Sequence, residues 1–122
     1  MTRDEFDAFC GTLPATTHVV QWGASSVWKV GGKIFAICSH WGDGDHSKIS
    51  FKCSEMSYVV LREQPGIVPA PYLARAGWVQ LDDPATLSDM DTELYIREAH
   101  RIIAGKLTRA KQRELGLTQR DQ

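Results

Sequence analysis

The chain has 122 residues, of which 43% are hydrophobic and 24% charged, as in one folded domain; this composition excludes a mainly disordered chain. Fourteen basic and fifteen acidic side chains give a net charge of −1, whereas dedicated nucleic-acid-binding domains usually carry a positive excess. With no apolar run long enough to cross a bilayer, no visible secretory signal and an odd number of cysteines (three), the sequence predicts a cytoplasmic protein with reduced thiols and no membrane partner.

The first half of the chain predicts one helix followed by strands. Thr2 and Glu5 have the spacing of a capping box, and apolar residues then recur at helical intervals, so we expect a helix over residues 3–11. β-Branched and aromatic residues dominate the segments that follow. The predicted strands cover residues 16–22, 26–30, 33–39 and 48–53.

Two features specify how these strands are arranged. Gly31 and Gly32 separate the second and third strands, and a two-residue Gly-Gly link is typical of a tight hairpin. In the fourth strand, Lys48, Ser50 and Lys52 alternate with apolar residues, which predicts one buried face and one wet, basic face.

The second half predicts two more helices and a last strand. Ser54 caps a helix that runs to about residue 63, and residues 64–77 form a loop rich in proline and glycine. A strand follows at 78–81, and a long helix begins at Ser88 or Asp91 and runs to about residue 116. We therefore expect an α+β fold, an antiparallel sheet with helices packed on one face, in a single domain over residues 1–116 with a mobile tail at 117–122.

Charge is uneven along the second half. Acidic residues dominate positions 82–93, and basic residues dominate positions 97–113. A basic C-terminal helix suits a phosphate backbone. The same distribution also complements the helix dipole, and this is the interpretation that the pattern favours on its own.

Catalytic and metal-binding signatures are weak. No serine lies in a nucleophile elbow and no glycine-rich phosphate loop precedes a helix, so we do not expect an enzyme or a bound cofactor. One short segment is dense in potential metal ligands, and its Gly-Asp pairs are also typical of a turn. These ligands are His40, Asp43, Asp45 and His46.

Three segments together resemble one protein family. Residues 27–36 read VWKVGGKIFA, residues 50–53 read SFKC, and residues 61–70 read LREQPGIVPA. In this combination the chain is similar to the MmcQ/YjbR family of small bacterial proteins over about residues 2–113. The resemblance implies a CyaY-like (frataxin-like) fold and a DNA-binding mode in which hairpins act as a double wing.

The first functional hypothesis is therefore a DNA-binding or regulatory protein that contacts the phosphate backbone of double-stranded DNA. Basic residues of the sheet and of the C-terminal helix would supply the contacts, and two aromatic side chains would add to them. The basic residues are Lys29, Lys33, Lys48, Lys52, Arg75, Arg109 and Lys111, and the aromatic residues are Tyr72 and Trp78.

Two alternatives remain at this stage. The open sheet face and the proline-rich segment 65–78 would suit a protein partner. By analogy with the frataxin-like fold, Asp4, Glu5 and Asp7 on the first helix would suit a metal. The sequence does not specify an oligomeric state. The DNA hypothesis requires that the scattered cations meet on one surface.

Overall fold

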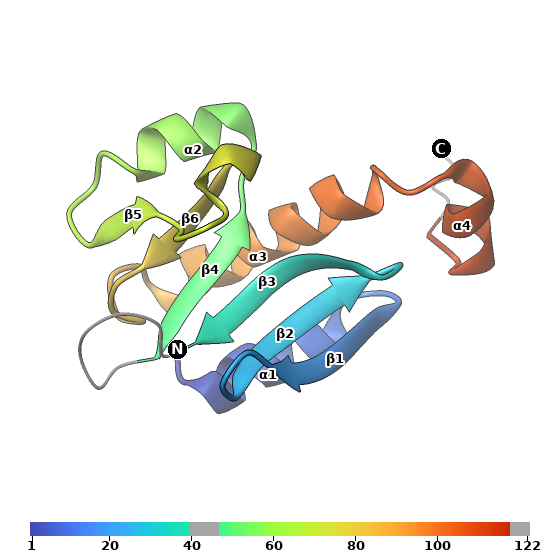
Figure 1. The fold of residues 1–122 in the computed structure, drawn as a ribbon, viewed down its shortest axis with the longest axis horizontal. Coiled ribbons are helices and arrows are strands. Elements are labelled where there is room, and N and C mark those ends of the chain that lie inside the picture. Colours follow the sequence, from blue (N-terminus) through green and yellow to red (C-terminus); the bar gives the residue numbers. More distant parts are fainter. Residues whose placement is uncertain (40–46, 118–122) are drawn as a thin grey trace.

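An antiparallel sheet of six strands forms the centre of the computed structural model, which describes residues 1–39 and 47–117 (Figure 1). The strands are β1 (Thr16–Gln21), β2 (Ser25–Val30), β3 (Lys33–Ser39), β4 (Lys48–Lys52), β5 (Ile67–Pro69) and β6 (Trp78–Leu81). Their order across the sheet is β1-β2-β3-β4-β6-β5. The helices are α1 (Arg3–Thr12), α2 (Glu55–Leu61), the short 3₁₀ helix η1 (Ala74–Ala76), α3 (Asp89–Ala104) and α4 (Arg109–Glu114). The predicted α+β class is confirmed.

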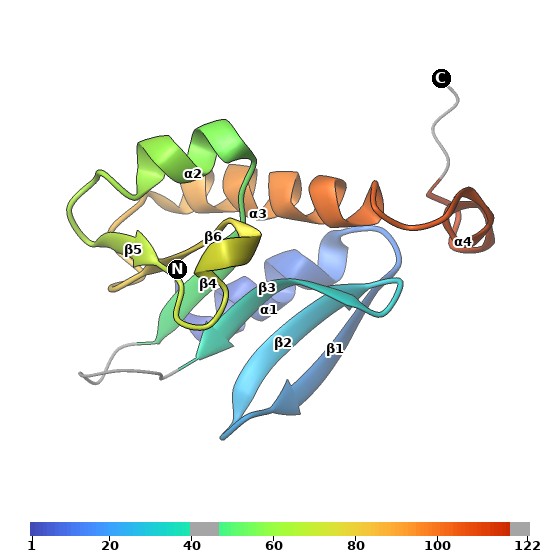
Figure 2. The same cartoon turned by 45° about the horizontal axis from the view of Figure 1, so that its top comes forward.

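The main core lies between the sheet and the two long helices. α1 and α3 run along the face that lies behind the strands in Figure 1, and in Figure 2 both helices again lie on the far side of β2 and β3. Phe35 and Phe51 from the strands and Phe6 and Ile96 from the helices are fully buried there. The alternation of apolar residues in β4 thus identifies the helix-covered face correctly.

The opposite face of the sheet is also covered, and this corrects the prediction of an open sheet face. Residues 70–77 fold across it, and Ala70, Leu73 and Trp78 form a second apolar cluster with Val27 and Ile37. The proline-rich segment is therefore not one long loop. It contains β5 and η1, which the sequence analysis missed because the short apolar stretches are interrupted by proline and glycine.

The polar side of β4 is buried as well. Lys48 retains only 6% of its exposed surface and Ser50 retains none, so the prediction that they face solvent is wrong. Ser50 lies between Ile37 of β3 and Gln80 of β6 in the register of the sheet. Within the described residues, the side-chain oxygens of Ser50 and Gln80 have no hydrogen-bond partner. Strand alternation reports which residues share a face, but not whether another segment covers that face.

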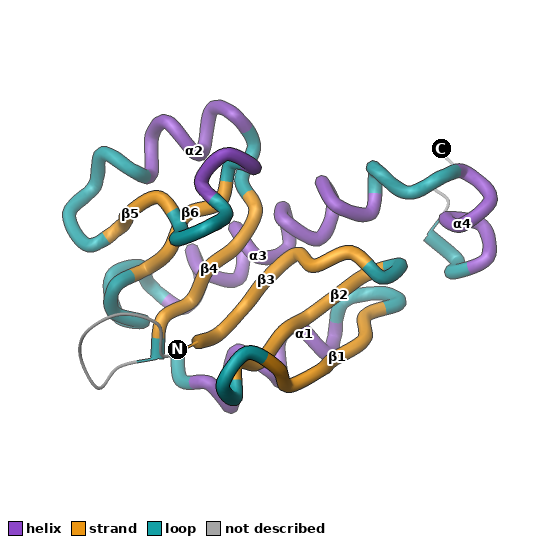
Figure 3. The backbone as a smooth tube through the Cα atoms, in the orientation of Figure 1, coloured by secondary structure: helices purple, strands orange, loops and turns teal. Residues whose placement is uncertain are grey.

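The long C-terminal helix ends earlier than predicted. α3 stops at Ala104, a short loop follows, and Thr108 caps the separate helix α4 (Figure 3). The side-chain amide of Gln112 donates hydrogen bonds to the carbonyls of Ala104 and Leu107, at 3.1 and 3.0 Å. These bonds satisfy carbonyl groups that the end of α3 leaves without helical partners, and they stabilise the break.

A hydrogen-bonded cluster attaches α1 to the edge of the sheet. The carboxylate of Asp7 accepts hydrogen bonds from Ser26 Oγ at 2.5 Å and from Trp28 Nε1 at 2.8 Å. The ring of His18 stacks on Trp28, with 4.6 Å between centroids, and its Nε2 lies 2.7 Å from Ser26 Oγ. Asp7 is the acceptor for both donors, so the cluster depends on its carboxylate.

We expect Asp7→Ala to destabilise the protein by about 2–4 kcal/mol, because two partly buried donors would lose their acceptor. The matched control is Asp4→Ala, on the same helix and exposed, which should cost less than about 1 kcal/mol through the helix dipole. Urea unfolding followed by circular dichroism measures both variants. Equal losses in the two variants would contradict the role assigned to Asp7.

Candidate nucleic-acid interface

The topology of the sheet gathers basic residues at one of its ends. β2 and β4 both finish at this end, towards which their arrows point in Figure 1, and α3 finishes there as well. Lys29 and Lys33 flank the β2–β3 turn, and Lys52 is the last residue of β4. Arg75 lies in η1, directly before β6, whose first residue pairs with Lys52. We call this region the basic end.

The hairpin turn is held against the residues that follow α3. Gly31 has a φ of +58°, and a Cβ built on it would lie 2.5 Å from a methyl carbon of Leu107. Leu107 is itself buried, between Lys106 and Thr108, the residue before Arg109. This close approach places the cations of the hairpin and those of the C-terminal segment at the same end of the molecule.

A pocket of about 580 Å³ opens between the end of β4, helix α2, η1 and the end of α3. Four cations line it: Lys52, Arg62, Arg75 and Lys106. Lys52 Nζ donates a hydrogen bond to the carbonyl of Ala76. Burial lowers the pKa of Lys52, and the positive charge of Lys106 lowers it further. We call this hollow the basic pocket.

Two of these four cations were not selected from the sequence. Lys106 belongs to the basic run at 97–113, but nothing in the run distinguishes it from its neighbours. Arg62 lies beside Glu63 and looks like part of an ordinary helix end. Only the return of residues 70–77 over the sheet brings Arg75 into the same pocket as these two residues.

Few ion pairs form among the described residues of the basic end. Lys111 Nζ pairs with a carboxylate oxygen of Glu114 at 2.8 Å, which reduces the attraction of Lys111 for phosphate. Within residues 1–39 and 47–117, no ion pair involves the other cations of this end. These unpaired cations are Lys29, Lys33, Lys52, Arg62, Arg75, Lys106 and Arg109.

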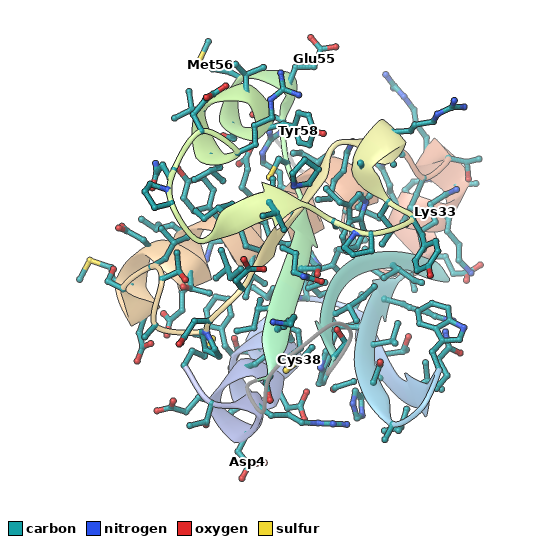
Figure 4. All side chains as sticks on the ribbon, turned by 60° about the vertical axis from the view of Figure 1, so that its left-hand side comes forward. Asp4, Lys33, Cys38, Glu55, Met56 and Tyr58 are labelled. Carbon is teal, nitrogen blue, oxygen red and sulfur yellow. The ribbon has the colours of Figure 1, made fainter. Side chains whose placement is uncertain are left out.

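Four acidic residues lie at the other end. α1 begins with Asp4 and Glu5, and α3 begins with Asp89 and Asp91. The amino group of Met1 lies 2.9 Å from Asp89, so the starts of the two helices are adjacent. Figure 4 shows Asp4 pointing outward on the side opposite Glu55 of α2. The net charge of −1 therefore conceals a strong separation of charge.

Two predicted contact residues do not belong to a surface. Lys48 lies at the start of β4, away from the basic end, and its Nζ donates to the carbonyl of Asp82 at 3.1 Å. Trp78 is only 4% exposed because it fills the apolar cluster under residues 70–77. Tyr72, by contrast, is 98% exposed and has a positive φ of 67°. Of the two predicted aromatic contacts, Tyr72 alone is accessible.

The cluster around Asp7 contains serine, histidine and aspartate, but not in a catalytic order. Ser26 Oγ donates its proton to Asp7 and so accepts from the Nε2–H of His18. In a triad the histidine instead accepts the serine proton and the aspartate orients the histidine. Ser26 is also fully buried, which keeps a substrate away. This cluster is structural.

The cysteines and acidic residues supply no alternative site in the described chain. Burial raises the pKa of Cys10, Cys38 and Cys53, that of Cys53 to about 12, so the thiols stay protonated near neutral pH. Asp7 is occupied by its hydrogen bonds, and Glu5 by the capping box with Thr2. No group of three or more histidine, cysteine, aspartate or glutamate side chains that could hold a metal occurs in residues 1–39 and 47–117.

Two sets of predictions fall outside these residues. His40, Asp43, Asp45 and His46, the candidate metal ligands, lie outside the described chain, as do residues 118–122 of the predicted tail. None of the helices in the described ranges combines the length and the apolarity needed to cross a membrane.

Comparison with known proteins identifies relatives of the same fold. A family model described as YjbR matches residues 11–102. A crystal structure of Deinococcus radiodurans protein DR2400, with a DUF419 domain, has a TM-score of 0.83 at 24% identity, covering 96% of this chain and 89% of that one. A Pseudomonas syringae protein has a TM-score of 0.69 at 19% identity, covering 84% of this chain and 99% of that one. No curated protein matches.

His100 provides a test of how the described core responds to pH. Burial lowers its pKa, although its hydrogen bond of 2.8 Å to the carbonyl of Pro14 acts in the opposite direction. The unfolded chain therefore takes up the proton at a higher pH than the folded one. The contribution of His100 to the free energy of unfolding should be fully present above the unfolded pKa of about 6.5. It should decrease as the pH drops towards the lower folded pKa, by at most about 1.4 kcal/mol per pH unit.

In His100→Gln this part of the pH dependence should disappear, because glutamine can still donate to Pro14 but does not titrate. Urea unfolding of both proteins between about pH 7.5 and about pH 5 measures the difference. Parallel pH profiles would show that another group causes the loss.

Proposed function

The chain belongs to the YjbR family, and on this basis we propose that it binds double-stranded DNA by contacting the phosphate backbone through the basic end. The observation that carries the proposal is the accumulation of cations without ion-pair partners in the described chain, contributed by the β2–β3 hairpin, β4, η1 and the segment after α3. A duplex presents closely spaced phosphates, and a positive surface of several side chains attracts it without base contacts.

The geometry favours an electrostatic mode of binding that does not depend on the base sequence. Lys33 and Arg109 are exposed near the hairpin tip, and Arg75 is exposed on η1. Among the described helices, α4 is exposed and carries Arg109 and Arg113 on one face, but with six residues it is short for a recognition helix and suits phosphate contacts instead. With about five phosphate contacts, the logarithm of the binding constant should fall with the logarithm of the salt concentration with a slope of about −4.5.

The acidic residues at the other end of the molecule determine how the protein is oriented on a duplex. Asp4, Glu5, Asp89 and Asp91 repel phosphates, so only the basic end can approach a duplex closely. A protein with net charge −1 can therefore bind DNA weakly and in one orientation. This separation removes the objection that the overall charge raised against nucleic-acid binding.

A protein partner is a second candidate, favoured by the surface of α2. Met56 is 77% exposed, and Val59 and Val60 are each half exposed, so this helix presents an apolar face to solvent. Tyr72 lies on the segment that follows β5 and is also exposed. The buried sheet face is not available for this purpose. Failure of the wild type to bind a duplex at low salt would favour this alternative.

We expect Lys33→Gln combined with Arg109→Gln to weaken duplex binding about tenfold or more at low salt and to reduce the salt slope by about 2. The matched control is Arg3→Gln combined with Arg97→Gln, which removes the same charge outside the basic end: Arg3 begins α1 and Arg97 packs over Phe9. Fluorescence anisotropy with a labelled duplex at about 50 and about 200 mM salt measures both.

The control double variant should bind as the wild type does. Two outcomes would contradict the proposal: equal weakening in the two double variants, which would reflect net charge alone, and the absence of wild-type binding at low salt.

A further inference from the structure

The basic pocket differs from the rest of the basic end because it is concave. Its volume of about 580 Å³ falls within the range of roughly 300–1,000 Å³ that is usual for small-molecule sites. A duplex backbone contacts side chains spread over an open surface, whereas a hollow of this size has room for one small group. The pocket therefore suits a small ligand, distinct from the duplex.

The charges around the pocket identify the sign of that ligand. Lys52, Arg62, Arg75 and Lys106 line it, and Glu55 is the single carboxylate among its described lining residues. Figure 4 shows Glu55 and Met56 pointing away from the body of the molecule, whereas Tyr58 is turned back towards it. Four cations against one outward-pointing carboxylate favour an anion with more than one negative charge.

The position of Lys52 suits an anion such as a phosphate group. Lys52 is partly buried, and its ammonium donates to the carbonyl of Ala76 and lies close enough to Lys106 to be affected by its charge. An ammonium has three protons, so two remain for a ligand. Gly77, with a φ of +78°, leaves space for this ammonium, because a Cβ there would come within 3.0 Å of Lys52 Nζ.

The wall that α2 contributes to the basic pocket is largely apolar. Tyr58 and Val59 line it, and the guanidinium of Arg62 lies 5.0 Å from the centre of the Tyr58 ring. The guanidinium covers one face of the ring, so the surface beside the cations consists of the guanidinium itself, the ring edge and Val59. A nucleobase can pack on such a surface, because planar guanidinium groups stack on bases.

We propose that the basic pocket binds a nucleoside monophosphate, with the phosphate against Lys52, Arg75 and Lys106 and the base against Tyr58 and Val59. The same chemistry occurs in a free mononucleotide and in the 5′-terminal phosphate of a nucleic-acid strand. The inference goes beyond the proposed contact with duplex DNA, because Lys33 and Arg109 do not line the pocket.

Isothermal titration calorimetry with adenosine 5′-monophosphate tests the proposal on the full chain. Adenosine and inorganic phosphate should each bind at least about tenfold more weakly, because each keeps only one half of the contacts. Arg75→Gln and Lys106→Gln should each weaken nucleotide binding about tenfold, and Tyr58→Leu should weaken binding of the nucleotide but not of phosphate. Arg3→Gln, at the start of α1 and outside the basic end, is the matched control and should bind as the wild type.

Thermal unfolding of each variant shows whether it is folded, and Tyr58→Phe, which keeps the ring, should restore nucleotide binding. To separate the two sources of the ligand, a single-stranded oligonucleotide is compared with and without a 5′-phosphate. A preference for the phosphorylated strand, with free nucleotide binding more weakly, assigns the pocket to strand ends. Tighter binding of the free nucleotide assigns it to a small molecule.

Three results would overturn the proposal. The first is the absence of heat with nucleotide at millimolar concentration together with no preference for the phosphorylated strand. The second is wild-type affinity in both Arg75→Gln and Lys106→Gln. The third is phosphate binding as tight as nucleotide binding, which would remove the role of the α2 wall. Loss of duplex binding in the hairpin variants, with nucleotide binding intact, separates the failure of one proposal from that of the other.

Discussion

The packing of Trp78 and Leu73 against Val27 and Ile37 is the constraint on which the functional surface depends. This small apolar cluster draws residues 70–77 across the face of the sheet that the helices leave uncovered. Backbone hydrogen bonds fix the position of the segment, from Ala70 N–H to the Trp78 carbonyl and from Cys53 N–H to the Gly77 carbonyl. Because η1 lies within this segment, its attachment determines that Arg75 and Gly77 lie beside Lys52. Without the cluster there would be no basic pocket.

The separation of charge has two physical origins that reinforce each other. In α3, acidic residues at the start and Arg101 near the end complement the helix dipole, so stability alone accounts for that pattern. The dipole does not explain Lys33, Lys52 or Arg75, which come from strands and from η1. These residues reach the end of α3 only because neighbouring strands are antiparallel and a tight glycine turn joins β2 to β3. Their position argues for a role in binding an anion, because folding does not require it.

The sequence predicts those parts of the fold that local chemistry decides. The Gly31-Gly32 turn, the capping box at Thr2 and the apolar alternation in β4 each depend on residues close together in the chain, and each is confirmed. The errors share another origin. Whether Lys48 is exposed depends on residues that are distant in the chain, such as Asp82, whose carbonyl accepts its hydrogen bond. Residue type suggested Trp78 as a contact, although the same size and apolarity make it a core residue.

The site was predicted less completely than the fold for a related reason. The residues of a basic surface made from several elements have no characteristic spacing in the sequence. Arg62 and Lys106 therefore carry no local signal that distinguishes them from solvated charges. What the sequence can show is the inventory of cations. Which of them share a surface depends on the strand order and on the return of residues 70–77.

Lys106 connects the two proposed binding events. It lines the pocket, and it directly precedes Leu107, which packs against the hairpin turn at Gly31. An anion bound in the pocket would neutralise part of the positive charge that attracts a duplex to the hairpin and to Arg109. Over distances comparable with the Debye length, about 8–10 Å at physiological salt, each ligand would weaken the binding of the other even though they share no contact. The same arrangement of cations that makes each site possible therefore couples them with a negative sign, and the coupling is reciprocal because it is a difference in binding free energy.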